Sequence, residues 1–130
     1  MLEKHQFNQL DLDNLIEELK DLAKQEKRRV NSLLEQIIIH LLLYQYWEEQ
    51  REYKGNHWRA EILAFRTQIN DDLTTNMRNL LSQKLEVIYD NAVGYVQTKT
   101  QLNNLPQNCD YSLNQLLNIN WYPDININHK

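Results

Sequence analysis

The sequence predicts an all-α fold, a bundle of three long helices at about 13–49, 57–73 and 76–102 plus a short C-terminal helix at about 113–118. Apolar residues recur at helical spacing through each long segment. The 130 residues include only 2 glycines and 2 prolines, too few for the many turns of a β-rich fold. The apolar run 37–47 would be apolar all round a helix, so it must be buried by its own domain or by a partner. A chain of this length is most simply one domain, 1–130.

The first helix is predicted from one apolar stripe that neither Gly nor Pro interrupts. Asp11 or Asp13 is a suitable N-cap, because its carboxylate can accept from open amides of the first turn. Charged residues occupy the back of the first half of the helix, whereas apolar residues occupy the back of the second half. We therefore expect the first half on the outside of the domain and the second half through its centre. The stripe comprises Leu12, Leu15, Leu19, Leu22, Glu26, Val30, Leu33, Ile37, His40, Leu41 and Tyr44.

A turn is predicted across 48–56, where charges of both signs precede the turn signal Gly55-Asn56. Asn56 is then the N-cap of the second helix. Thr74 or Thr75 is expected to cap the third helix, and Pro106 to end it.

The C-terminal segment carries its own signals. Ser112 and Gln115 fit the capping-box pattern and predict the short last helix. The aromatic pair Trp121-Tyr122 is expected to fasten the tail to the bundle, and residues 124–130 are expected to be flexible.

Composition narrows the function classes. The net charge of −4 gives no overall electrostatic footprint for nucleic acid. A single cysteine, Cys109, cannot form an internal disulfide, and the start of the chain has no apolar signal core, so we expect a cytoplasmic protein. The run 37–47 is too short to cross a bilayer. We find no catalytic motif, phosphate loop or metal-binding spacing, and we expect no metal or cofactor.

Three polar residues stand out near the start: Asn14, Glu17 and Glu18. Paired carboxylates near a histidine can bind a metal or perform acid–base chemistry. On one straight helix, however, His40 lies roughly 33 Å from Glu18, so the groups could meet only through a kink or a second subunit. The simpler interpretation is a solvated first turn.

A second grouping is a pocket at His40 and Arg66, roofed by Trp58 and Tyr44, which the chain forms if the second helix folds back along the first. We expect His40 to be neutral, because burial and an adjacent arginine both disfavour imidazolium. The functional hypothesis is that this pocket binds a small anionic ligand or is the active site of an enzyme. The alternative is a core histidine beside an arginine that extends to solvent.

The third grouping is the stretch 51–66, where basic and aromatic residues alternate, as in some nucleic-acid-binding proteins. Four glutamates in or beside the same stretch cancel its field, so nucleic-acid binding is the weakest hypothesis.

The ordered set of motifs resembles the bacterial family catalogued as domain of unknown function 29, over about residues 8–123. The motifs are the segment LDLDNLIEEL from Leu10 to Leu19, His40-Leu41-Leu42, Trp58-Arg59 with Ile62 and Arg66, Leu105-Pro106, Cys109-Asp110-Tyr111, and Leu113 with Gln115, Leu116 and Leu117. The resemblance implies an all-helical protein of a family numerous in cyanobacteria. It implies no activity.

The chain departs from the family pattern in three places. The extra N-terminal helix of the family is expected to be missing, a glycine common near Ala23 is absent, and the usual Cys-Pro-Tyr reads Cys109-Asp110-Tyr111.

The function that these observations favour is a protein–protein interaction or regulatory module. Another protein or a second copy is the expected partner, with self-association favoured, because three helices are not expected to cover all the apolar surface around 37–47. Neither a membrane nor nucleic acid is expected as a partner.

Overall fold

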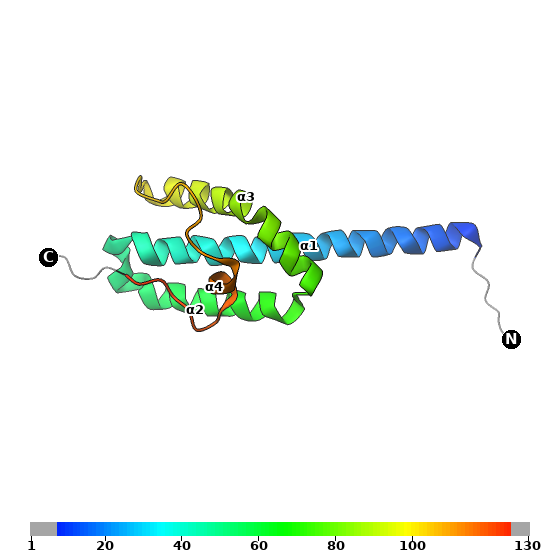
Figure 1. Ribbon diagram of the computed structural model, residues 1–130, viewed down its shortest axis with the longest axis horizontal. Helices are drawn as coiled ribbons and strands as arrows, with labels where there is room; N and C mark the ends of the chain where they lie inside the picture. The colour runs from blue at the N-terminus through cyan, green and yellow to red at the C-terminus, as the bar shows by residue number, and fades with distance from the viewer. Residues whose placement is uncertain (1–7, 126–130) are drawn as a thin grey trace.

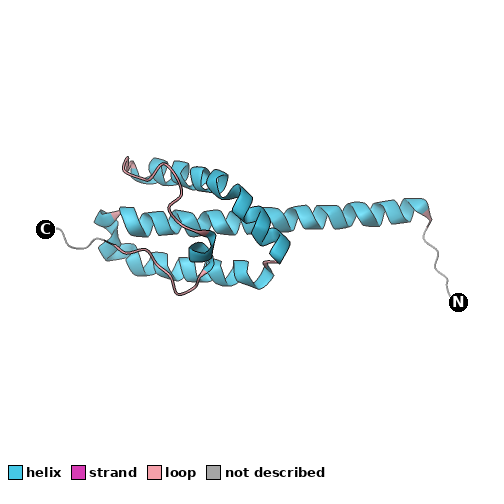
Figure 2. Ribbon diagram, in the orientation of Figure 1, coloured by secondary structure: helices cyan, strands magenta, loops and turns pink. Residues whose placement is uncertain are grey.

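The computed structural model describes residues 8–125, which form helices and loops with no strand among them (Figures 1 and 2). The helices are α1 (Gln9–Tyr46), α2 (Glu48–Asp72), α3 (Thr75–Thr100) and α4 (Leu113–Leu117). The predicted all-α class is confirmed, with three long helices and a short last one. Of the tail expected to be flexible, all but Asp124 and Ile125 lies outside the described residues.

The second half of α1 is the centre of the molecule. Helices α2 and α3 pack on opposite sides of it, and α4 contacts all three (Figure 1). Ile37 and Ile38 are completely buried, and so are Leu41 and Leu42. The run 37–47 is therefore covered by the chain's own helices, and the uncovered apolar surface expected there is not found.

The connection between α1 and α2 differs from the predicted turn at 48–56, which is wrong. Only Trp47 separates the two helices, and α2 begins at Glu48. The Arg51 side chain donates from Nε to the carbonyl of Tyr44 and from Nη2 to that of Gln45, both at 2.7 Å. These bonds satisfy carbonyls that the end of α1 leaves open, so the chain can reverse without a longer loop. Gly55 is a buried residue within α2, where a Cβ would lie 4.0 Å from the Tyr44 ring.

The other helix ends can be compared with the predicted caps one by one. Asn8 accepts from the amide of Asp11 at 2.8 Å, so α1 begins before the predicted caps Asp11 and Asp13. Thr74 caps α3, and the capping box of Ser112 and Gln115 starts α4, both as predicted. Gln101 ends α3 in a left-handed conformation with φ of 63°, before Pro106 is reached, so the role expected for Pro106 is wrong.

The segment after α3 folds back over the bundle. The Tyr89 hydroxyl donates to the carbonyl of Pro106 at 2.6 Å, and the Tyr111 hydroxyl donates to the Gln45 side chain at 2.7 Å. Burial raises the pKa of both tyrosines, so they remain protonated donors. Leu116 is fully buried and places α4 against the other three helices.

Candidate functional site

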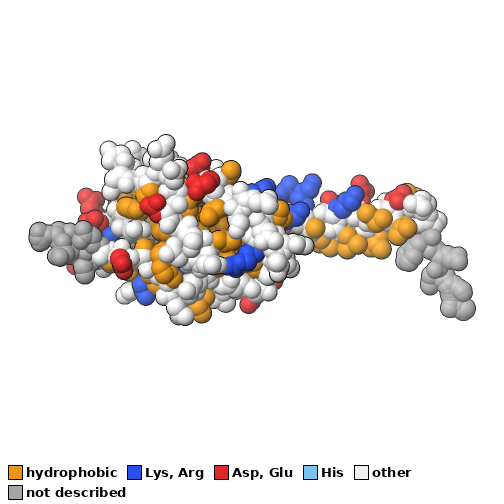
Figure 3. Space-filling view, in the orientation of Figure 1, with side chains coloured by type: hydrophobic (Ala, Val, Ile, Leu, Met, Phe, Trp, Pro, Cys, Tyr) orange, Lys and Arg blue, Asp and Glu red, His pale blue; other side chains and the backbone are white. Residues whose placement is uncertain are grey.

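The first half of α1, residues 9–29, extends beyond the bundle as a single helix (Figure 1). The first half lies outside the bundle, as expected, but its apolar stripe is also exposed. One side of it is nevertheless apolar, and Figure 3 shows hydrophobic side chains along that side. We call this surface the projecting face. Its large members, exposed by 43–60%, are Leu12, Leu15, Ile16, Leu19 and Leu22.

The projecting face continues a stripe that is buried farther along the same helix. Val30 and Leu33 follow at helical spacing and belong to the core. One helix therefore presents the same kind of surface twice, covered by α2 and α3 in its second half and uncovered in its first half.

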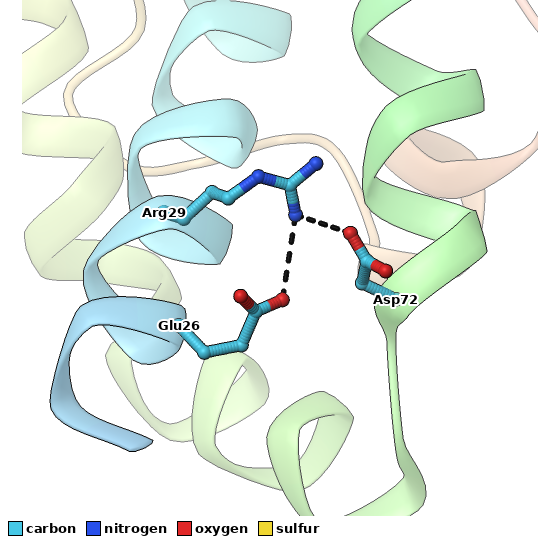
Figure 4. A network of polar contacts seen from close by, with 3 residues as sticks. All are labelled: Glu26, Arg29 and Asp72. Carbon is cyan, nitrogen blue, oxygen red and sulfur yellow. Dashed lines mark hydrogen bonds and ion pairs between the residues drawn. The ribbon is translucent and has the colours of Figure 1, made fainter. Parts of the chain in front are cut away.

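A small polar network marks the point where the bundle ends (Figure 4). Arg29 pairs with Glu26 at 3.4 Å and with Asp72 at the C-terminal end of α2. The side chains are about two-fifths exposed, so each pair contributes at most about 1 kcal/mol. The main effect of the network is to fix the position of the base of the projecting half relative to α2.

Charge changes sign along the projecting half. Residues 9–19 contain four carboxylates and no lysine or arginine, whereas residues 20–29 contain five lysines or arginines and two carboxylates. In Figure 3 the basic side chains gather nearest the bundle and acidic ones lie toward the outer end. Only Asp11 lies in the first turn of α1, where a carboxylate complements the positive end of the helix dipole.

Asn14, Glu17 and Glu18 are exposed on this projecting half, away from His40. No group of three or more His, Cys, Asp or Glu residues able to hold a metal occurs within residues 8–125. The structure thus places these three residues on a solvent-exposed helix.

Arg66 is fully buried and joins α2 to the end of the chain. Its Nε donates to the carbonyl of Leu116 at 2.7 Å, Nη1 to that of Trp121 at 2.7 Å, and Nη2 to that of Gln115 at 3.1 Å. Burial lowers its pKa from 12.5 to about 10, so it stays charged at neutral pH. The expected extension of Arg66 to solvent is wrong, and the structure does not bring it together with His40.

His40 lies in a different place, at the edge of the core. Its Nδ1 is 2.8 Å from the carbonyl of Gln36, and its ring packs against Phe65 with centroids 5.3 Å apart. Burial is the main cause that lowers its pKa, which fits the expectation of a neutral ring. His40 and Trp58 line one cavity together with Lys99 of α3. Sequence reasoning missed Lys99, because no spacing in the chain places the end of α3 beside His40.

Tyr44, the other expected roof residue, belongs to an aromatic group outside that cavity. Its hydroxyl accepts from Arg59 at 3.2 Å, and its ring lies 5.9 Å from that of Tyr122. The Arg59 guanidinium lies 3.8 Å from the centre of the Tyr122 ring, a cation–π contact. The expected fastening of the C-terminal aromatics to the bundle is present here.

The arginines of the stretch 51–66 are therefore engaged inside the molecule. Arg51 holds the end of α1, Arg59 stacks on Tyr122, and Arg66 holds α4. Lys54 and His57 remain exposed. Few cations are left here for a nucleic-acid backbone.

Cys109 is half-buried, and its thiol donates to the carbonyl of Tyr111 at 3.4 Å. Burial, followed by the charges of Glu86 and Asp110, raises its pKa. The sulfur is therefore held as a thiol, which is a poor nucleophile.

Within residues 8–125, none of the helices is long and apolar enough to cross a membrane. No curated protein and no solved structure matches the chain. A family model described as "Domain of unknown function DUF29" matches residues 1–122. The match covers nearly the whole chain. The structure has the all-helical fold that the family resemblance implied. The chain belongs to the DUF29 family.

Proposed function

We propose that this protein is an interaction module that pairs with a second copy of itself through the projecting face. The observation that carries the proposal is the exposure of Leu19 and Leu22, by 57% and 60%, on a helix whose same stripe is buried elsewhere. Exposed apolar residues that gather on one surface mark interaction sites more often than scattered ones do. The apolar surface expected around 37–47 plays no part, because the aliphatic residues of that run are buried.

The charge pattern supports a second copy as the occupant. The outer part of the projecting half is acidic and the inner part is basic. When two copies pair antiparallel, the acidic part of each lies beside the basic part of the other. Parallel pairing would place like charges side by side, which is unfavourable. We therefore propose the antiparallel arrangement.

The spacing of the leucines fits this arrangement. Leu12, Leu15, Leu19 and Leu22 follow the 3-4-3 spacing of a coiled-coil seam. In an antiparallel pair centred near Glu17, Leu12 lies opposite Leu22 of the second copy and Leu15 lies opposite Leu19. These pairs and their symmetry mates form a continuous leucine seam.

The test is the molar mass in solution, measured by light scattering across protein concentrations. The unmodified protein should be a dimer. The double variant Leu15→Glu/Leu19→Glu should be a monomer, because it places charges in the seam. Both residues are outside the bundle core, so the melting temperature of the monomer should report a folded bundle.

The matched control is Asn14→Glu/Gln25→Glu, which adds the same number of charges to the projecting half but away from the projecting face. This variant should remain a dimer. A monomeric unmodified protein, even at about millimolar concentration, would contradict the proposal and indicate that another protein or another part of the chain covers the face.

A further inference from the structure

A cavity of about 170 Å³ lies in the bundle, and residues from all three long helices line it. It is separate from the projecting half, because none of its lining residues precedes Gln36. A buried water needs only about 10–15 Å³ of such space, so this cavity has room for a small molecule. Its polar and aromatic lining includes His40, Trp47, Lys54, His57, Trp58 and Lys99.

Like charges gather at this cavity. Lys54 comes from α2 and Lys99 from the last turn of α3, and neither forms an ion pair with a carboxylate of residues 8–125. Burial is the main cause that lowers the pKa of His40; the hydrogen bond to Gln36 and the charge of Glu61 in α2 raise it, and the smaller effects of His57 and Lys99 lower it. Two lysines and no carboxylate line the cavity, so it favours an anion.

Two polar groups at the cavity have no partner in the described part of the chain. The Nδ1 of His40 lies against the carbonyl of Gln36, which requires a proton on Nδ1 and leaves Nε2 open. The indole N–H of Trp58 makes no hydrogen bond with residues 8–125, although the side chain is only 3% exposed. The indole N–H of Trp58 is a buried donor without an acceptor, which is costly, whereas Nε2 of neutral His40 is an open acceptor that becomes a second donor when it is protonated. An oxygen-bearing ligand would then accept from both groups.

We propose that this cavity binds a small phosphate-bearing anion, held by Lys54 and Lys99 and in contact with His40 and Trp58. Phosphate suits the site because it carries up to two charges and several acceptor oxygens, which lysines and N–H donors recognise. The negative charge also stabilises imidazolium, so binding takes up a proton from solvent onto Nε2 of His40. Trp47 and Trp58 are stacked with centroids 6.1 Å apart, so an aromatic wall adjoins the phosphate position.

The experiment is an NMR titration with inorganic phosphate at fixed ionic strength, following the His40 ring and the Trp58 indole N–H. Both signals should shift and saturate, with a dissociation constant of about 1 mM or less. The apparent pKa of His40 should rise by about half a unit or more at saturation. The absence of a saturable shift up to about 20 mM phosphate would overturn the proposal.

A second arm of the titration distinguishes the source of the phosphate group. Phenyl phosphate should bind about tenfold more tightly than inorganic phosphate if the ligand is an aromatic phosphoester that uses the tryptophan wall. Equal affinities would assign the site to phosphate itself. Weaker binding of phenyl phosphate would also assign it to free phosphate, because the cavity would then exclude the ring.

The variant Lys54→Gln/Lys99→Gln should weaken phosphate binding about tenfold or more, because it removes two charge-assisted hydrogen bonds. Both lysines are exposed, so the melting temperature should stay close to that of the unmodified protein. The control Lys20→Gln/Lys24→Gln changes the same charge on the projecting half and should leave phosphate affinity unchanged. Equal weakening in both variants would show a general charge effect and overturn the proposed site.

Discussion

At Arg66, one side chain supplies the donors that close the bundle. Three carbonyls from the α4 region accept from a guanidinium that has no exposure to water. An arginine is buried at low cost only when its donors are satisfied in this way. Its planar fork reaches three acceptors at once, which a lysine cannot do.

Replacing Arg66 by methionine should therefore destabilise the protein strongly. Arg66→Met removes the charge but leaves buried carbonyls without donors, and we expect a loss of about 3 kcal/mol or more in the free energy of unfolding. Urea unfolding followed by tryptophan fluorescence measures this. Arg28→Met, on the exposed part of α1, is the control and should stay within about 0.5 kcal/mol. Equal unfolding midpoints for the two variants would show that Arg66 does not hold α4.

Residue pairs far apart in the chain were the least predictable part of the site. The sequence identifies Arg66 and His40 as unusual, but it does not say which groups they meet. Arg66 is 55 residues from Trp121, whose carbonyl it binds. Helical spacing relates residues a few positions apart, so it carries no information about such pairs. The pairing of His40 with Arg66 therefore stays a hypothesis that the geometry does not support.

At the scale of elements, α1 has two halves with different sources of stability. The second half is held by burial of apolar side chains against α2 and α3. The first half has only its cap at Asn8, the carboxylate of Asp11 in its first turn and the network at Arg29. Most helical stability in proteins comes from tertiary packing, which the first half lacks, so pairing of two copies would stabilise it further.

A proline in the projecting half should disrupt that half of α1 without unfolding the bundle. Leu19→Pro removes a helical hydrogen bond and costs about 3 kcal/mol locally. We expect circular dichroism to show loss of part of the helix and light scattering to show a monomer. The thermal unfolding of the bundle should move by only a few degrees, since no residue before Val30 belongs to the core. A collapse of the bundle in this variant would contradict the division of α1.

Local capping signals predicted the starts of α3 and α4, but not those of α1 and α2. Thr74 and the pair Ser112 and Gln115 set the starts of α3 and α4, because a side-chain oxygen beside open amides acts within one turn. The signal Gly55-Asn56 failed for a physical reason. Arg51 satisfies the end of α1 and makes a longer turn unnecessary.

At the scale of the whole molecule, a short bundle carries the projecting half of α1 as one long arm (Figure 1). The arm is straight because α1 is one helix of 38 residues, about 57 Å long. Antiparallel pairing of two arms would place the two bundles at opposite ends of the assembly.

Small-angle X-ray scattering tests this arrangement. Two helices of this length that overlap over residues 9–25, the register centred near Glu17, give an antiparallel dimer with a maximum dimension on the order of 80 Å or more. The distance distribution should have two maxima, one within a bundle and one between bundles. A dimer whose maximum dimension stays near about 60 Å would indicate parallel arms and contradict the charge argument.

The connection through Trp47 alone sets the order in which contacts can form. Helices α1 and α2 meet across one residue, so their pairing closes almost no loop and should come early in folding. The acceptors of Arg66 lie 49–55 residues later in the chain. At a synthesis rate of roughly 5–20 residues per second, the carbonyls that accept from Arg66 are made about 3–10 seconds after Arg66 itself. Over that interval α2 must keep Arg66 hydrated, and the docking of α4 becomes the step that finally removes water from the bundle.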